Sequence, residues 1–268
     1  MRHEVVFGNA QQQQVQQRAA FLWPLLKDQP RFTCYGRGVG LPSAADYDLE
    51  VALALVGLQG ICSIQHAERA VSGDIRAELQ DAGLTLDSYV SWEGEDAAVT
   101  AAREVLDERA LSGDLTVREV DAATGAEDLA RLDDLATQCE MLLPMGSFLR
   151  GEQRPSCFLF AQDGAGRVVG LAGSVAANHP DHPGGDRPWW GLLGTHPDRR
   201  GEGIAMILGA MAIVQMHARF GFRAFMPGIR TGNTPSEALC SKLGFAGTSR
   251  EILVAIDPTQ LAGGRITK

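Results

Sequence analysis

The sequence contains few cysteines, no long apolar run and fewer basic than acidic residues. Its five cysteines stand singly, without a Cys-x-x-Cys pair, and this odd, scattered set argues against a disulfide framework or a zinc ribbon. The longest apolar run is interrupted by Gly209 and is too short to span a bilayer. Met1 to Glu4 lack the apolar core of a secretion signal. We therefore expect a cytoplasmic protein with no membrane partner.

The acidic residues are concentrated in the first part of the chain. Residues 1–113 hold 9 basic and 16 acidic side chains, whereas the remaining residues hold 15 and 17. This imbalance argues against nucleic acid as a partner. It is compatible with a cationic amine substrate, but an acidic surface that only keeps the protein soluble explains it as well or better. The stretch His179-Pro180-Asp181-His182 has no further ligand nearby, so we predict no metal site.

A chain of 268 residues is long enough for one or two domains. Leu111-Ser112-Gly113-Asp114 is typical of a boundary, which gives an α/β domain over 1–113 and a second domain over 114–268. In the first domain, periodicity predicts helices at 9–26, 43–58, 67–82 and 96–111, and strands at 32–35 and 84–92. Gly36 to Gly40 is interpreted as a turn, because no third glycine stands at the offset of a dinucleotide-binding loop.

The second domain has a regular predicted order of elements. It reads strand 115–120, helix 126–139, a break at 142–146, a hairpin of strands 157–161 and 167–177, strand 189–195, helix 204–214, strand 224–229, helix 234–243 and strand 245–256. The residues after Pro258 are predicted to be a tail. The fold class is therefore a mixed α/β sheet protein.

The most informative stretch joins a buried strand to a buried helix. Between Trp189–Thr195 and the helix from Ile204 stands Arg200-Gly201-Glu202-Gly203-Ile204-Ala205. Two glycines leave little side chain above the first turn of the helix, so its free N–H groups can approach a ligand closely. The helix dipole favours an anion there, and Arg200 adds positive charge. The alternative is a helix start with glycines that serve packing alone.

Two nucleotide-binding loops do not fit this stretch. No Lys-Ser/Thr pair follows Gly203, as a P-loop requires, and Ala205 stands one residue too early for a Rossmann turn. What remains is Arg200-x-x-Gly203-x-Ala205 after a strand. This resembles the pyrophosphate-binding motif of the GNAT N-acetyltransferase superfamily, which holds acetyl-coenzyme A.

A later stretch strengthens this resemblance. Asn233 to Phe245 reads Asn, a short helix, then Lys-x-Gly-Phe, which is similar to a second GNAT motif. Thr234 and Glu237 have the spacing of a capping box, and Pro235 suits the first helical turn. The resemblance covers about residues 115–257. It implies the GNAT fold for the C-terminal domain, with residues 1–113 as a degenerate GNAT copy or an unrelated cap.

The resemblance also implies a site. Leu193 and Thr195 would contact the pantetheine arm, the segment Arg200, Gly201, Glu202, Gly203, Ile204, Ala205 would hold the diphosphate, and Asn233 would lie near the pantetheine or cap its helix. The family's usual general acid, a tyrosine, is replaced by Cys240, which is either the acid or a packing residue. The strand has no carboxylate to serve as base, which leaves His196, Glu140, Asp181 and His182 as alternatives.

We therefore expect an N-acetyltransferase that moves an acetyl group from acetyl-CoA to a small-molecule amine. The alternative is a catalytically degenerate coenzyme A-binding sensor or scaffold, because the usual tyrosine and glutamate are missing. All cofactor motifs lie after residue 190, so the second domain alone should bind coenzyme A. The sequence leaves open whether the protein is a monomer or a homodimer.

Overall fold

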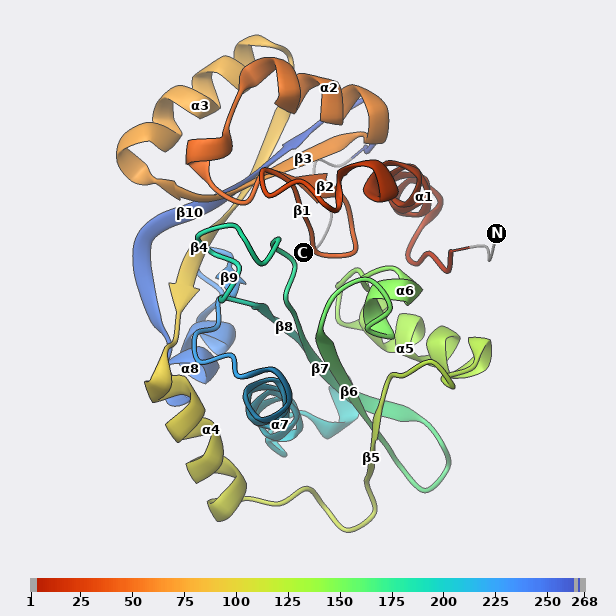
Figure 1. Ribbon diagram of the computed structural model, residues 1–268. Helices are drawn as coiled ribbons and strands as arrows, with labels where there is room; N and C mark the ends of the chain where they lie inside the picture. The colour runs from red at the N-terminus through yellow and green to blue at the C-terminus, as the bar shows by residue number, and fades with distance from the viewer. Residues whose placement is uncertain (1–3, 263–264, 266–268) are drawn as a thin grey trace.

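The computed structural model describes residues 4–262 and residue 265, and Figure 1 traces their course. Its helices are α1 Ala10–Leu26, α2 Leu49–Gln59, α3 Arg69–Asp81, α4 Asp96–Glu108, α5 Ala126–Gln138, α6 Gly146–Leu149, α7 Ile204–Phe220 and α8 Thr234–Lys242, with 3-10 turns η1 Ala44–Asp46 and η2 Pro197–Arg199. Its strands are β1 Thr33–Cys34, β2 Val39–Gly40, β3 Ile61–Glu68, β4 Thr85–Glu93, β5 Thr116–Glu119, β6 Ser156–Gln162, β7 Val168–Val175, β8 Trp189–Thr195, β9 Gly228–Ile229 and β10 Ala246–Ile256.

The described strands form two larger antiparallel sheets and the small β1–β2 ribbon. One large sheet has the order β5-β6-β7-β8 and the other has the order β3-β10-β4-β9. The last strand of the chain, β10, therefore lies between two strands of the first predicted domain, as the blue ribbon in Figure 1 shows. The prediction of a strand at 245–256 is confirmed, but its partners are distant in sequence.

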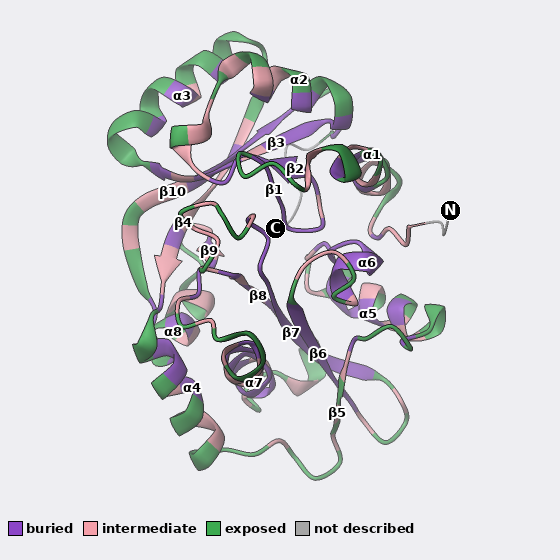
Figure 2. Cartoon of the chain, viewed as in Figure 1, coloured by how far each residue is buried: buried purple, intermediate pink, exposed green. Residues whose placement is uncertain are grey.

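Alternating side chains of the β5–β8 sheet supply two cores. Phe158 and Phe160 of β6 join one cluster with the leucines of α5, whereas Leu159 joins a second cluster with α7. Helix α7 packs between this sheet and α4. Figure 2 shows β6 and β7 buried between these layers, whereas buried and half-buried residues alternate along β8. Helix α7 is buried on most sides, which explains why its sequence is apolar nearly throughout.

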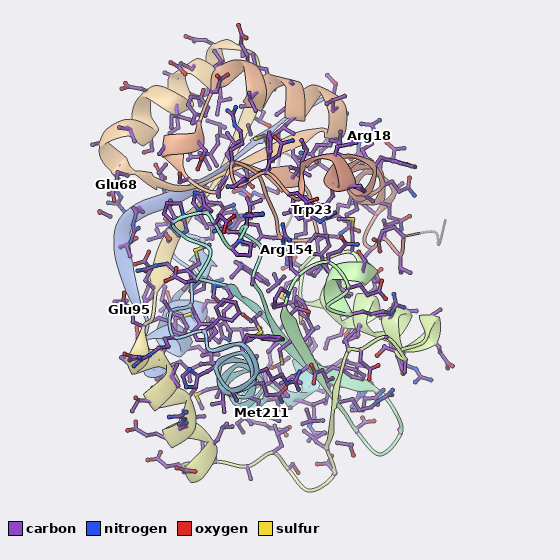
Figure 3. All side chains as sticks on the ribbon, in the orientation of Figure 1. Arg18, Trp23, Glu68, Glu95, Arg154 and Met211 are labelled. Carbon is purple, nitrogen blue, oxygen red and sulfur yellow. The ribbon has the colours of Figure 1, made fainter. Side chains whose placement is uncertain are left out.

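The two predicted domains share a hydrophobic core. The cluster that contains Phe158 also holds Leu41 and Ile64 from the first domain. Arg154, just before β6, places its Cζ 5.1 Å from the centre of the Trp23 ring on α1, and Figure 3 labels both residues at this junction. The boundary predicted at residues 113–114 falls in the loop between α4 and β5. The division into 1–113 and 114–268 stays a prediction. The two parts share one hydrophobic core and one β-sheet.

Several predicted elements differ locally. Helix α2 begins at Leu49 with Asp48 as its cap, because Ser43 starts the separate turn η1. The strand β3 was not predicted, since a bulge at its His66 end breaks the alternation of buried side chains. The predicted tail is partly folded: Leu261 is 1% exposed, whereas residues 263–264 and 266–268 lie outside the description, as do residues 1–3 of the expected leaderless start.

Candidate active site

The site begins where β8 and β9 separate. The backbone N–H of Trp190 donates to the carbonyl of Met226 at 3.1 Å, and the N–H of Met226 donates to Pro188 at 3.1 Å. Beyond this point β8 continues with β7, whereas β9 pairs with β4 in the other sheet. The two neighbouring chains therefore diverge into a wedge whose walls come from different sheets.

A bulge lies on the β8 wall of this wedge. Gly191 pairs with Gly173 and Gly194 with Leu171, so Leu192 and Leu193 together face one residue of β7. Leu192 has a φ of 59°, a left-handed conformation that is uncommon for a side chain with a Cβ. A bulge of this kind leaves an extra residue outside the strand ladder. Backbone polar groups are thus available to a ligand in the wedge.

The wedge holds a cavity of about 300 Å³. Its walls come from the loop before β2, from β3, β4, β8, β9 and β10, and from α8 with its N-cap. This volume is at the small end of the range for ligand pockets in proteins. The C-terminal segment contributes Leu193, Asn233 and Cys240, whose predicted roles stay predictions, and also Cys139 and Met141, which the sequence did not indicate.

The two adjacent tryptophans of β8 have different surroundings. Trp190 is fully buried, donates from Nε1 to the Gly209 carbonyl at 3.0 Å, and stacks on Phe245 with ring centres 4.8 Å apart. Trp189 points to the opposite face, where its ring lies across Gly191: a Cβ on that glycine would be 2.8 Å from Cζ2 of Trp189. The Trp190 ring is therefore part of the core, whereas the Trp189 ring faces the cavity.

The glycine-rich turn after β8 has an open helix N-terminus. Gly201 and Gly203 have φ values of 86° and 78°, and no side chain caps α7, whose N-cap residue is Gly203. No atom lies within 4 Å of a Cβ built on Gly201, and only Met206 reaches that distance from Gly203. The first N–H groups of α7, from Ile204 onward, are thus open to a ligand, and the helix dipole favours an anion there.

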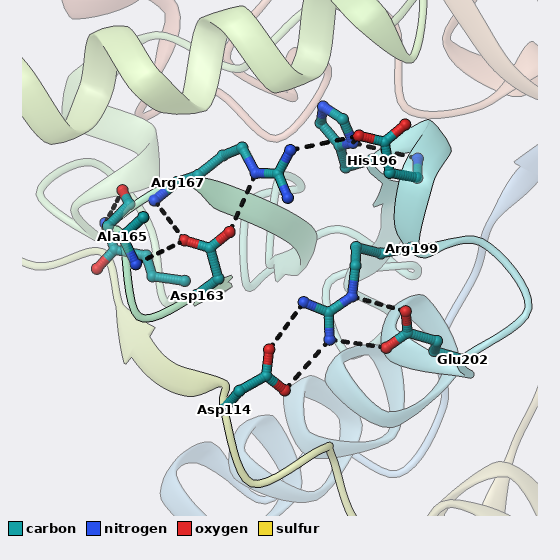
Figure 4. A network of polar contacts seen from close by, with 10 residues as sticks. Asp114, Asp163, Ala165, Arg167, His196, Arg199 and Glu202 are labelled. Carbon is teal, nitrogen blue, oxygen red and sulfur yellow. Dashed lines mark hydrogen bonds and ion pairs between the residues drawn. The ribbon is translucent and has the colours of Figure 1, made fainter.

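Two neighbouring arginines beside this turn have different partners. Figure 4 shows Arg199 between Asp114 and Glu202: its Nε is 2.6 Å from Glu202 Oε1, and its Nη1 is 3.0 Å from Asp114 Oδ2. The hydrogen bond from Arg199 lowers the pKa of Glu202. Arg200 is exposed and, within residues 4–262, has no ion pair. Its charge is therefore available to an anion, whereas the Glu202 carboxylate is held by Arg199.

The strand β8 leads from the cavity to the glycine-rich turn. Thr195, at the end of the strand, accepts a hydrogen bond on its carbonyl from Cys139 Sγ at 3.5 Å. Cys139 lines the cavity, and burial raises the pKa of its thiol while the charge of Arg200 opposes the rise. Thr195 and residues 200–205 do not line the cavity itself. The predicted residues thus follow β8 from the cavity to the glycine-rich turn beside Arg200.

Cys240 and Asn233 occupy the α8 side. Cys240 is 1% exposed, and burial raises the pKa of its thiol to about 12. Such a thiol is a weak acid, which counts against proton donation to a thiolate whose own pKa is near the ordinary 8.5. Asn233 is exposed and is itself the N-cap of α8, accepting from the N–H of Ser236 at 3.3 Å. The predicted Thr234–Glu237 capping box is therefore wrong by one residue.

The four residues considered as bases do not line the cavity. His196 Nδ1 accepts from the N–H of Asp198 at 3.2 Å and so caps the turn η2. His182 Nε2 is 3.2 Å from Asp46 Oδ2 in the loop before β8, and Asp181 is exposed in the same loop. Glu140 lies in the turn after α5 with a φ of 56°. The part of the chain that the structure describes also has no cluster of three or more metal-ligating side chains.

The first segment supplies cavity residues that the sequence analysis missed. Tyr35 is 8% exposed and its ring is edge-on to Trp189 at 6.2 Å. Its hydroxyl has no partner at hydrogen-bond geometry, although Thr33 is close enough to oppose the rise in its pKa that burial causes. Arg37 and Tyr89 also line the cavity. The signal that could have indicated Arg37 is its place among three glycines, which was interpreted only as a turn.

Comparison with protein families identifies the C-terminal part. Residues 126–245 match the model of the acetyltransferase (GNAT) family, which confirms the resemblance drawn from the two motifs. The match indicates an enzyme of the acetyltransferase class. Among curated proteins, none matches this chain. No helix in residues 4–262 combines the length and apolar character needed to cross a bilayer.

Solved structures share the fold over most of the chain. A Drosophila protein has a TM-score of 0.55 at 13% identity, over 82% of this chain and 71% of its own. A GCN5-related N-acetyltransferase-like protein from Streptococcus suis has a TM-score of 0.51 at 16% identity, over 84% and 83%. A tandem GNAT protein of the clavulanic acid pathway has 0.51 at 14%, over 76% and 66%. Similarity at this identity shows the fold alone, and the tandem architecture fits a degenerate N-terminal copy.

Proposed function

Because residues 126–245 match the acetyltransferase (GNAT) family, we propose that this chain transfers an acetyl group from acetyl-CoA to the amine of a small acceptor. The observation that carries the proposal is the uncapped N-terminus of α7, which follows directly after β8, a strand that forms one wall of the cavity. The wedge has the shape for an extended thioester arm, and the turn has the charge for a diphosphate. The proposal places the diphosphate, the pantetheine arm and the transfer step in turn.

The diphosphate would bind at the turn. Backbone N–H groups of residues 201–205 would donate to its oxygens, and Arg200 would supply a full positive charge. The ion pair with Arg199 compensates the charge of Glu202, a carboxylate in this turn that would otherwise repel the ligand. Gly201 and Gly203 would allow the phosphate oxygens to approach the backbone.

The pantetheine arm would lie along β8. Leu193 and Thr195 would offer backbone groups to its amides, as an edge strand does to a peptide. Asn233 would stand on the opposite side at the α8 cap, where its exposed side chain can contact the arm. The thioester would then reach the bulge at Leu192, close to Trp189.

The transfer itself needs little from the protein beyond positioning. The neutral amine nitrogen attacks the thioester carbonyl carbon, the carbon–sulfur bond breaks, and the amine proton is ultimately carried to the departing sulfur or to water. The products are an N-acetyl amine and the free thiol of coenzyme A. Backbone N–H groups of the bulge would stabilise the oxyanion. No carboxylate lines the cavity in the described residues, so water is the proposed carrier of the amine proton.

The test is turnover of acetyl-CoA with a broad panel of small amines, read out as release of free thiol and as mass of the acetylated product. The proposal predicts thiol release that depends on the amine and yields one N-acetyl product per thiol. Binding of acetyl-CoA without turnover of any amine would favour the sensor or scaffold. Failure to bind acetyl-CoA at all would contradict the proposed site.

A further inference from the structure

Arg37 is presented to the cavity by a loop whose glycines fit closely against neighbouring elements. The carbonyl of Gly36 accepts from the N–H of Met145 at 2.6 Å, and a Cβ on Gly36 would lie 2.7 Å from Pro144. A Cβ on Gly38 would lie 2.5 Å from Ile61 of β3. A larger residue than glycine at position 36 or 38 would therefore clash with these neighbours. The arginine between them is the one long side chain of this turn, and it lines the cavity.

The guanidinium of Arg37 is held in place by neutral groups. Its Nε donates to the carbonyl of Leu142 at 2.8 Å, and its Cζ lies 5.2 Å from the centre of the Trp189 ring. No carboxylate pairs with it anywhere in residues 4–262. A carbonyl and an aromatic face fix its orientation and leave most of its N–H donors without an anionic partner.

The second arginine of the cavity differs in this respect. Arg230 forms a two-pronged ion pair with Asp87, whose side chain is 5% exposed, and its Cζ lies 4.8 Å above the Tyr89 ring. The charge of Arg230 is therefore compensated inside the protein. Among the described lining residues, Arg37 and Arg230 are cationic and none is anionic. Because Asp87 compensates Arg230, the charge of Arg37 makes the cavity wall net positive.

A half-buried cation without a counter-ion is unfavourable, and proteins normally pair such a group. Burial lowers the pKa of Arg37 to about 10, so the side chain is still charged at neutral pH. A ligand carboxylate would supply the missing anion, and the planar guanidinium can bind it through two parallel hydrogen bonds. No acidic residue in the described part of the first segment lines this cavity, and Asp87, which lies nearest in the contacts described, is paired with Arg230.

Resting on the proposed acetyl transfer, we propose that Arg37 binds a carboxylate of the acceptor, which is therefore an amino acid or a closely related amine that carries a carboxylate. The carboxylate would sit against Arg37 and Trp189, while the amine would face the bulge at Leu192. Aromatic walls from Tyr35, Trp189 and Tyr89 would contact an apolar or planar side chain.

The experiment compares each common amino acid with its carboxamide, which keeps the amine and removes the negative charge. In the unmodified protein, kcat/KM is expected to be higher for the acid than for its amide by roughly ten-fold or more, the effect of one charge-assisted pair. In Arg37→Gln that preference should disappear through a rise in KM for the acid, while Arg37→Lys keeps part of it. Arg103→Gln on the exposed face of α4 is the matched control and should leave the preference unchanged.

A second arm does not depend on turnover. Binding of N-acetyl amino acids and their amides is measured by calorimetry in the same four proteins, with acetyl-CoA binding as the check of folding. Arg37-dependent binding of the acids alone supports the inference even if acetyl transfer fails. Equal affinity and equal kcat/KM for acids and amides would overturn it, as would a preference for the acids that survives Arg37→Gln. Turnover confined to carboxylate-free amines would overturn it and leave the proposed function intact.

Discussion

The side chains of Trp189 and Trp190 illustrate how one strand serves two purposes. Alternation along β8 sends Trp190 into the core beside α7 and Trp189 into the cavity beside Arg37. The period of two could be predicted from the sequence, but not which face would be lined by the first segment. The residues that complete this face, Tyr35 and Arg37, lie about 150 positions earlier, and no local pattern connects them.

The environment of Cys240 predicts a packing role. It is 1% exposed, and a thiol with a pKa of about 12 retains its proton throughout the range in which the enzyme would work. We expect Cys240→Ala to leave kcat within about two-fold and to lower the free energy of unfolding by about 1 kcal/mol. Thiol release and urea unfolding measure the two quantities. A ten-fold loss of kcat with acetyl-CoA affinity retained would restore Cys240 as the acid.

His66 predicts how stability depends on pH. Burial, with the charges of Arg250 and Arg187, lowers its pKa to about 4 from the ordinary 6.5. Between pH 6.5 and 4 the unfolded chain therefore binds a proton that the folded chain does not, and folding stability falls as pH falls through this window. At pH 5 this group alone should cost about 2 kcal/mol relative to pH 7.5.

The control for this prediction is His66→Asn. Asparagine does not titrate here and tolerates the φ of 51° that His66 adopts at the bulge in β3. Urea unfolding of both proteins at pH 7.5 and pH 5 cancels the titration of the carboxylates they share. The unmodified protein should lose more stability than the variant on acidification, and an equal loss in both would show that His66 is not held neutral.

The β8–turn–α7 unit was the most predictable element pair of the chain. Strand, glycines and helix are local features, and the structure has β8 over 189–195 and α7 from Ile204, as the sequence indicated. By contrast, β3 was missed, because its bulge and its buried Cys62 and Ile64 give neither helical nor alternating periodicity. Local signals thus predicted the cofactor side, and the acceptor side depends on contacts that are distant in sequence.

The two arginines before α7 give a paired test of this element. Arg200 has no ion pair in the described residues, whereas Arg199 is held by Asp114 and Glu202. Arg200→Gln should therefore weaken acetyl-CoA binding by roughly three- to ten-fold, with a smaller salt dependence, without changing stability. Arg199→Gln should also weaken acetyl-CoA binding, because it frees the Glu202 carboxylate beside the phosphate site. Calorimetry at two salt concentrations measures both, and an unaffected Arg200→Gln would remove that side chain from the site.

At the scale of the whole molecule, β10 connects the two predicted domains through one β-sheet. This strand pairs with β3 on one side and β4 on the other, although it follows the predicted boundary by more than a hundred residues. Its Leu253 and Ala255 are fully buried in the core that both segments share. The expectation that residues 114–268 alone bind coenzyme A overlooked this pairing, because nothing local to β10 indicates its partners.

Fragment complementation tests this arrangement. Residues 114–268 expressed alone would expose β10 and the α4-facing side of α7, and we expect no cooperative unfolding transition and no acetyl-CoA binding. Co-expression with residues 1–113 should yield a stable complex that regains both properties. A fragment 114–268 that melts cooperatively and binds acetyl-CoA by itself would show that the C-terminal segment is an independent domain.

In the proposed complex, acetyl-CoA binds with its diphosphate at the N-terminus of α7. The most direct measurement is calorimetric titration of acetyl-CoA into the unmodified protein, Gly203→Ala and Gly203→Glu. Both variants carry the same strain at a φ of 78°, and only glutamate adds an anion where the phosphates would lie. The proposed site predicts moderate weakening for alanine and loss of binding for glutamate. Equal affinity in the two folded variants would contradict it.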